Sequence, residues 1–329
     1  MANTTATGDG PLGTTVIFCL MIPLNMIVLA ILLNLILEYD VRQIGKRLSI
    51  KLLLSPMNRI LILGVFCLIP FNICMVIQRF RDASTIEAKV SFVLEKLFLA
   101  IVELCGICYS WIRGEAVVNI VCPRFYNALK YSVMIFPAFF FLQVISTIAY
   151  VTYSVDSPGS IAILYAVEGS VILAGLIVCF FDAVFTVIFS KYIHQHKQLT
   201  KQDKKLYTIS KYSVIATETS FSAVLMYAAG FAFNSGALFD FSPNFISFTF
   251  WVLVRMKYML YKVVDGARSR ISSLQKRKTS VAVTEETSER SASVQSGSTI
   301  ENQANILVLP DYKGGSLPRN VRSSIQNNR

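Results

Sequence analysis

Long runs of uncharged, mostly apolar residues alternate with short polar segments between residues 12 and 260 of this 329-residue chain. A helix needs about 20 consecutive apolar residues to span the hydrocarbon core of a bilayer. Runs of about that length lie at residues 12–37, 60–77, 90–112, 131–153, 161–189, 213–233 and 239–260. The pattern predicts an all-α membrane protein built as a bundle of seven transmembrane helices.

Lys and Arg are unevenly divided among the connections between these runs. Fourteen lie after the first, third and fifth runs, whereas the other connections hold three, Arg79, Arg81 and Lys89. Cytoplasmic loops of membrane proteins carry the excess of basic residues. We therefore expect an extracellular N-terminus, residues 1–11, and a cytosolic C-terminus. Asn3 begins an Asn-Thr-Thr glycosylation sequon on the segment predicted to lie outside. We expect a multi-pass protein of the plasma membrane.

The composition agrees with a membrane protein. Hydrophobic residues make up 54% of the chain and charged residues 16%, with a net charge of +11, whereas soluble proteins carry about a quarter of charged residues. A soluble enzyme, a secreted disulfide-rich domain and a nucleic-acid-binding protein are therefore disfavoured. We expect no enzymatic activity, cofactor or metal site, because the only histidines, His194 and His196, lie in a Lys-rich connection typical of solvated loops.

The chain becomes basic and then polar after the seventh run. Residues 255–278 carry eight Lys or Arg, and the apolar residues of 263–278 recur at helical spacing. This predicts a basic amphipathic juxtamembrane segment on the anionic inner leaflet, the alternative being a simple stop-transfer anchor. Residues 279–329 are rich in Ser and Thr and predict a disordered cytosolic tail. Thr279 and Ser280 follow two basic residues, and their phosphorylation would release the segment from lipid.

Ionisable residues inside the predicted membrane helices indicate an inward-facing surface, because they are costly to expose to lipid. On the third helix a polar stripe at steps of three and four comprises Lys96, Leu99, Glu103, Gly106, Ser110 and Arg113. On the fifth it comprises Glu168, Ile172, Gly175, Cys179, Asp182 and Thr186, and the sixth carries Thr217, Glu218, Thr219, Ser220 and Ser222. These charges could line a ligand pocket, with Lys96 and Glu168 as candidates, or only hold the bundle together by internal salt bridges.

The predicted architecture resembles that of G-protein-coupled receptors over the whole chain. It shares with them seven helices, an extended fifth helix, a basic loop before the sixth helix, and a Ser/Thr-rich tail. The third helix ends Trp111-Ile112-Arg113-Gly114-Glu115, which places Arg113 where rhodopsin-like receptors keep Asp-Arg-Tyr. The Cys-Trp-x-Pro and Asn-Pro-x-x-Tyr motifs and the outer cysteine pair of that family are absent.

This resemblance implies a receptor that transmits an extracellular ligand's signal to a heterotrimeric G protein through movement of helices three, five and six. It also implies a resting ion pair between Arg113 and Glu218, which would separate on activation. Glu103 and Asp182 are further candidates for the ion pairs that change in this switch.

Two other functions stay open on the sequence. The inward charges at Lys96, Glu103, Glu168 and Asp182 could serve a proton- or cation-coupled small-molecule transporter. A bundle with neither pocket nor pathway would be a non-catalytic membrane scaffold. A transporter predicts a polar path through the whole bundle, whereas a receptor predicts an outward pocket closed on the cytosolic side.

Overall fold

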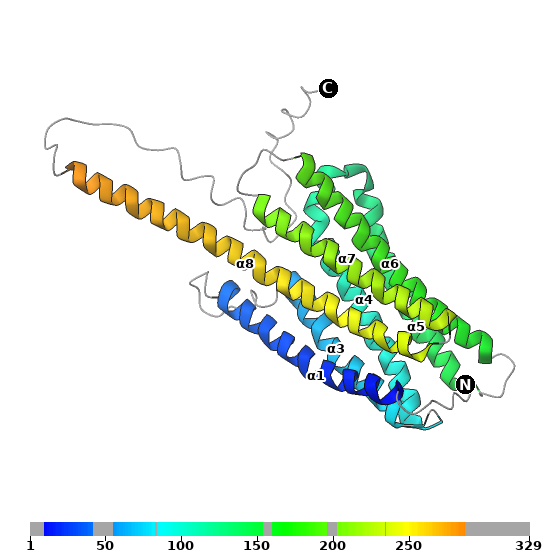
Figure 1. The fold of residues 1–329 in the computed structure, drawn as a ribbon. Helices are drawn as coiled ribbons and strands as arrows, with labels where there is room; N and C mark the ends of the chain where they lie inside the picture. Colours follow the sequence, from blue (N-terminus) through cyan, green and yellow to red (C-terminus); the bar gives the residue numbers. More distant parts are fainter. Residues whose placement is uncertain are drawn as a thin grey trace. The chain divides into compact units, whose positions relative to one another are not determined.

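The computed structural model describes residues 10–41, 55–82, 84–153, 160–195, 203–233 and 235–286. These residues form helices almost throughout (Figure 1). The elements are α1 (Gly10–Leu35), the π-helix η1 (Ile36–Val41), α3 (Pro56–Phe80), α4 (Ile86–Val121), α5 (Pro123–Thr152), α6 (Ser160–Gln195), α7 (Asp203–Ala232) and α8 (Gly236–Glu286). The chain divides into two units, Met1–Ser269 and Arg270–Arg329, and the helix bundle belongs to the first.

Six of the described helices are long and apolar enough to cross a membrane. They cover Gly13–Tyr39, Pro56–Phe80, Pro123–Thr152, Ile161–His194, Tyr207–Ala232 and Gly236–Val263. The chain therefore has the architecture of a multi-pass helical membrane protein. The helix at the third predicted span, α4, is not among the six, and it carries Glu95, Lys96 and Glu103. A seventh span is thus not confirmed, and the orientation of the termini stays a prediction.

Several helices extend beyond the apolar runs that predicted them. Helix α4 ends at Val121 rather than at residue 112, directly before Pro123 starts α5. Side-chain oxygens of Ser55 and Thr85 accept backbone N–H groups at the starts of α3 and α4, several residues before the predicted starts. Caps and prolines set the ends of a helix, whereas hydropathy measures only the part that suits lipid.

The predicted C-terminal segments fall partly inside α8. This helix continues past residue 260 to Glu286, so it includes the backbone of the predicted juxtamembrane segment, 263–278, and of Thr279 and Ser280. The side chains from residue 264 onward lie outside the described residues, as do Asn3 and the chain from residue 287 to its end.

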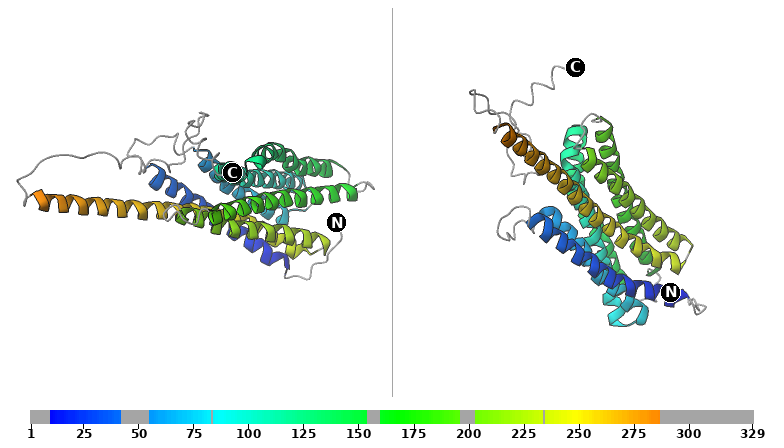
Figure 2. Two further views of the ribbon diagram at one scale, coloured as in Figure 1. Left: turned by 90° about the horizontal axis from the view of Figure 1, so that it is seen from above. Right: turned by 60° about the vertical axis from the view of Figure 1, so that its left-hand side comes forward.

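Helix α4 occupies the middle of the bundle. It packs against α3, α5 and α6, while α1 packs on α3, α5 on α6, and α6 on α7. The part of α8 that belongs to the first unit lies between α1 and α7 (Figures 1 and 2). There the indole nitrogen of Trp251 donates to Asn25 of α1 at 2.9 Å, and Ser242 donates to the Ala223 carbonyl of α7 at 2.9 Å. Lys257 of α8 also hydrogen-bonds Asn58 of α3.

Two large clusters of buried apolar side chains fill the bundle beside a small third one, and α4 contributes to both large clusters. One joins α1, α3, α4, α7 and α8 around Leu61, Tyr109 and Phe250. The other joins α4, α5 and α6 around Phe140 and Phe185. Because α4 is shared by both clusters, its rotation about its own axis decides which residues face each of them.

Two glycines let an aromatic ring of a neighbouring helix lie directly on the backbone. A Cβ atom at Gly64 of α3 would lie 2.2 Å from the ring of Phe250, and one at Gly114 of α4 would lie 2.1 Å from the ring of Phe185. Both rings are almost fully buried, so neither can move away without disturbing its cluster. The two glycines therefore fix how closely α3 approaches α8 and α4 approaches α6.

Replacing Gly64 by Ala is expected to destabilise the bundle by about 1–3 kcal/mol, since the added methyl overpacks the site against Phe250. Thermal unfolding of the detergent-solubilised protein measures the effect. Gly169→Ala in α6 is the matched control, because no atom lies within 4 Å of a Cβ placed there. Its melting temperature is expected to equal or exceed that of the wild type, and an equal loss in both variants would contradict the packing argument.

Candidate functional site

A cavity of about 360 Å³ lies among α3, α4, α6, α7 and α8. Both inward faces that the spacing predicted contribute to its wall. The whole α4 stripe lines it, namely Lys96, Leu99, Glu103, Gly106, Ser110 and Arg113, and so do Glu168, Ile172, Gly175, Cys179 and Asp182 of α6. The last member of the α6 stripe, Thr186, instead lies with its hydroxyl 3.2 Å from that of Thr217 on α7.

The predicted pairing of Arg113 with Glu218 is not formed. Glu218 is exposed on α7, on the same face as the exposed Val214 and Phe221, and it does not line the cavity. Helix α7 turns Ser220 inward instead, and residues two apart on a helix point about 200° away from each other. Among the described side chains, no ion pair joins Glu218 to Arg113.

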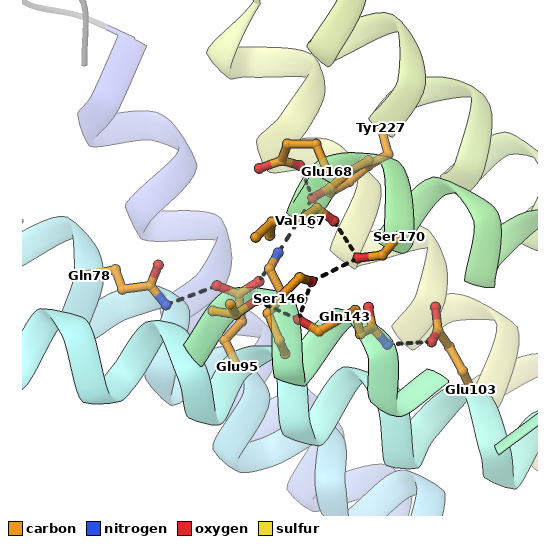
Figure 3. A network of polar contacts seen from close by, with 11 residues as sticks. Gln78, Glu95, Glu103, Gln143, Ser146, Val167, Glu168, Ser170 and Tyr227 are labelled. Carbon is orange, nitrogen blue, oxygen red and sulfur yellow. Dashed lines mark hydrogen bonds and ion pairs between the residues drawn. The ribbon is translucent and has the colours of Figure 1, made fainter. Parts of the chain in front are cut away.

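The wall of the cavity holds a network that we call the Lys96 network: Gln78, Glu95, Lys96, Glu168 and Tyr227. The ammonium of Lys96 lies 2.9 Å from Glu95 and donates to the hydroxyl of Tyr227 at 3.4 Å, and that hydroxyl donates to Glu168 at 2.5 Å. Gln78 donates to the other oxygen of Glu95 at 2.9 Å. Figure 3 shows Gln78, Glu95, Glu168 and Tyr227 converging from α3, α4, α6 and α7.

Burial makes the Lys96 network energetically important. The side chains of Lys96 and Glu95 are only 4% and 7% exposed. Charges removed from water need close partners, because desolvation costs each of them several kcal/mol. The Lys96 ammonium therefore pairs directly with the Glu95 carboxylate, and the Tyr227 hydroxyl links it to Glu168.

The sequence did not single out three members of this region: Glu95, Tyr227 and Asp240. Asp240, near the start of α8, forms an ion pair with Arg79 at the end of α3. Arg81 pairs with Glu87 at 2.9 Å. Three basic residues lie in connections predicted to be outside, and two of them, Arg79 and Arg81, thus each form an ion pair with an acid. For Glu95, the clue in the sequence was its position directly before Lys96, which indicates an ion pair.

Glu103 lies about two turns further along α4 than Lys96, which attracts its carboxylate electrostatically, and it has one described hydrogen bond. One of its carboxylate oxygens accepts a hydrogen bond from the Gln143 amide of α5 at 2.8 Å (Figure 3). Gln143 is fully buried, and no described side chain hydrogen-bonds or pairs with the second oxygen of Glu103. One turn further along α4, a Cβ at Gly106 would have no atom within 4 Å. Glu103 therefore stands beside open space in the cavity.

We call a second group of side chains the Arg113 cluster: Arg113 and Asp182, which line the cavity, with Tyr109, Phe189 and Met256, which contact Arg113. The guanidinium of Arg113 lies over the rings of Tyr109 and Phe189, with centroids at 5.8 and 5.4 Å, and one nitrogen lies 3.4 Å from the Met256 sulfur. Asp182 accepts the Ser110 hydroxyl at 2.6 Å and interacts electrostatically with the guanidinium. The two rings and Met256 are at most 1% exposed.

Toward one end of the bundle, which we call the closed end, the residues that line the cavity stop before the helices do. At the other end the cavity reaches Arg79 and Asp240, close to the end of α3 and the start of α8. Its deepest residue on α4 is Arg113, and α4 continues to Val121, about 12 Å further at ~1.5 Å per residue. At the closed end Arg113 contacts the buried side chains of Tyr109, Phe189 and Met256. Under the predicted orientation, the Asp240 end faces outside and the closed end faces the cytosol.

The described residues hold no group of three or more His, Cys, Asp or Glu side chains placed to bind a metal ion. No protein-family model matches the sequence, and comparisons with curated proteins and with solved structures give no match either. The function is therefore argued from the geometry and charge of the cavity.

Replacing Lys96 by Met is expected to lower the free energy of unfolding by about 3–5 kcal/mol, because it leaves buried carboxylates without their cation. The double variant Glu95→Gln/Lys96→Met should recover part of the loss, since it removes both charges of the pair. Arg81→Met is the matched control, as its ion pair with Glu87 is more than half exposed and should cost at most about 1 kcal/mol. Thermal and denaturant unfolding in detergent provide the measurement; equal losses for Lys96→Met and Arg81→Met would refute the role of burial.

Proposed function

We propose that this protein is a membrane receptor of the G-protein-coupled type. An extracellular ligand enters the cavity, and its binding is transmitted through α4 and its neighbours to a heterotrimeric G protein in the cytosol. The observation that supports this function is the extent of the cavity, whose lining residues reach Asp240 near the start of α8 but stop at Arg113, before the end of α4. Binding on one side with closure on the other is the arrangement expected of a receptor.

The polar contacts offer a route from ligand to response. The Lys96 network ties α3, α4, α6 and α7 together, so a ligand that displaces one of its bonds acts on several helices at once. Helices α4 and α6 then carry the change to Arg113 and Asp182, about 27 Å along α4 from Glu95. Packed interfaces of this kind change between discrete arrangements rather than deform gradually.

The predicted switch is accordingly reassigned. Asp182 takes the place of Glu218 as the acid that holds Arg113 in the resting state, because it lines the cavity beside Ser110 and acts on the guanidinium. Activation would separate Arg113 from Asp182 and from the rings of Tyr109 and Phe189. The cytosolic ends of the helices would then part to admit the G protein.

A proton- or cation-coupled transporter is the second candidate, and the ionisable residues along the wall from Glu95 to Arg113 favour it. A transporter must open alternately to both sides, so the Arg113 cluster would have to act as a gate. Proteoliposomes containing the purified protein distinguish the two functions. Acidification or substrate accumulation driven by a cation gradient supports transport, whereas a receptor leaves both unchanged.

Further partners and modifications complete the proposal. The basic residues of 255–278 would hold the start of the cytosolic region on anionic lipid, and phosphorylation of Thr279 and Ser280 would weaken that contact. Glycosylation of Asn3 would accompany placement in the plasma membrane. Phosphopeptide mapping and glycosidase treatment of the protein from its native cells test these modifications.

Replacing Asp182 by Asn is expected to raise basal G-protein activation about fivefold or more, because it removes the negative charge that holds Arg113 while keeping the side-chain size. A reporter cell line carrying a set of chimeric Gα subunits measures the signal, normalised to surface expression. Glu218→Gln is the matched control and should leave the basal signal unchanged, as Glu218 is exposed outside the cavity. A higher signal from Glu218→Gln, or none from Asp182→Asn with any Gα, would count against this mechanism.

A further inference from the structure

The charges that line the cavity do not balance. Three are cationic, Arg79, Lys96 and Arg113, and five are anionic, Glu95, Glu103, Glu168, Asp182 and Asp240. Each cation has an acid of its own: Arg79 pairs with Asp240 and Lys96 with Glu95, while Arg113 interacts with Asp182. Two carboxyl groups, those of Glu103 and Glu168, are left over. With every group charged, the wall carries two more negative than positive charges.

The two surplus acids differ in how the protein satisfies them. Glu168 accepts the Tyr227 hydroxyl at 2.5 Å, and the same hydroxyl accepts from Lys96, so a cation lies within the same short chain of bonds. Glu103 accepts one described hydrogen bond, from the neutral amide of Gln143, and Lys96, which is already paired with Glu95, attracts it without a direct contact. No described group hydrogen-bonds or pairs with its second oxygen, and Glu103 and Gly106, one turn apart on α4, both line the cavity. Glu103 is therefore the acid that a ligand can still reach and neutralise.

The surroundings of Glu103 select the kind of ligand. The cavity wall is mostly apolar and includes the rings of Phe71, Phe92, Phe239 and Phe250. An unpaired carboxylate in such surroundings is costly, and an anionic ligand would raise the cost further. A hard metal ion requires six or more oxygen ligands, whereas Glu103 offers one free oxygen among apolar neighbours. An organic cation supplies both a positive charge for the carboxylate and an apolar body for the wall.

We infer that the cavity binds a small organic ammonium ion, with its charge on the free carboxylate oxygen of Glu103, its polar hydrogens beside Gly106 and its apolar body against the aromatic wall. A cavity of about 360 Å³ lies within the usual range for small-molecule sites, about 300–1,000 Å³. This inference rests on the proposed function only in that it treats this cation as the receptor's ligand.

The test uses sets of probes that share one carbon skeleton and differ only in charge. The purified full chain in lipid nanodiscs is titrated with phenylethylammonium and phenylbutylammonium ions, with the corresponding alcohols and carboxylates, and with sodium chloride. Thermal unfolding reports binding, because a ligand of the folded state raises the melting temperature. The ammonium ions are expected to raise it in a saturable manner, and the alcohols, carboxylates and salt to leave it unchanged.

Two cavity variants and one control variant locate the bound charge. Glu103→Gln should weaken ammonium binding about tenfold or more, since it keeps the shape of the side chain and removes its charge. Glu218→Gln should bind like the wild type, because that residue lies outside the cavity. Gly106→Leu should exclude the probes by filling the space beside Glu103 while the carboxylate stays in place, and it serves as the deciding variant if Glu103→Gln does not fold.

The inference is overturned if no ammonium probe binds, if alcohol or carboxylate probes bind equally well, if sodium alone stabilises the protein, or if binding survives both cavity variants. These results are separate from those that test the receptor function. Ammonium binding that depends on Glu103, without activation of any Gα, would refute the receptor and leave the site. Constitutive signalling by Asp182→Asn without ammonium binding would refute the site and leave the receptor.

Discussion

The need to pair the buried charges of α4 governs the arrangement of this bundle. A single helix brings Glu95, Lys96, Glu103 and Arg113 into an interior where an unpaired charge costs several kcal/mol. Their partners come from α3, α5, α6 and α8 and, through Tyr227, from α7. The helices around α4 are therefore held at rotations that satisfy its polar groups, and the apolar clusters fill the space that remains.

The sequence predicted the inward faces of α4 and α6 because helical spacing is rigid: once one polar residue faces the interior, those three and four positions away must follow. It failed on α7, where consecutive polar residues from Thr217 to Ser220 cover more than one face and the period cannot choose between them. Glu218 was selected for its charge, although an inward position belongs to Ser220. The sequence pattern also could not predict which side chains of different helices pair. Such pairs depend on how each helix is rotated about its axis, and no single segment encodes that rotation.

Hydropathy located all seven helices yet did not establish all seven as spans. The same charges that make α4 central to the cavity separate it from the six helices that are apolar enough to cross a membrane. Its burial by neighbouring helices replaces the apolar surface that a lipid-facing helix needs. A functional helix at the centre of a bundle can thus be the one that a search for apolar segments recognises least well. Arg79 is likewise a poor guide to orientation when basic residues are counted in the connections. It forms an ion pair with Asp240, so its position is explained by the packing of the bundle.

The contact of Gly114 with the ring of Phe185 has a mechanical consequence for any rearrangement at the closed end. The ring sits on the α4 backbone one residue beyond Arg113, and it is held there by a buried apolar cluster. Sliding α4 along α6 would push the bulkier neighbours of Gly114 into the ring, whereas tilting the helices about this point keeps the contact. Gly114 and Phe185 therefore form a pivot, and motion at the closed end should be a lever-like swing of the helix ends with little axial translation.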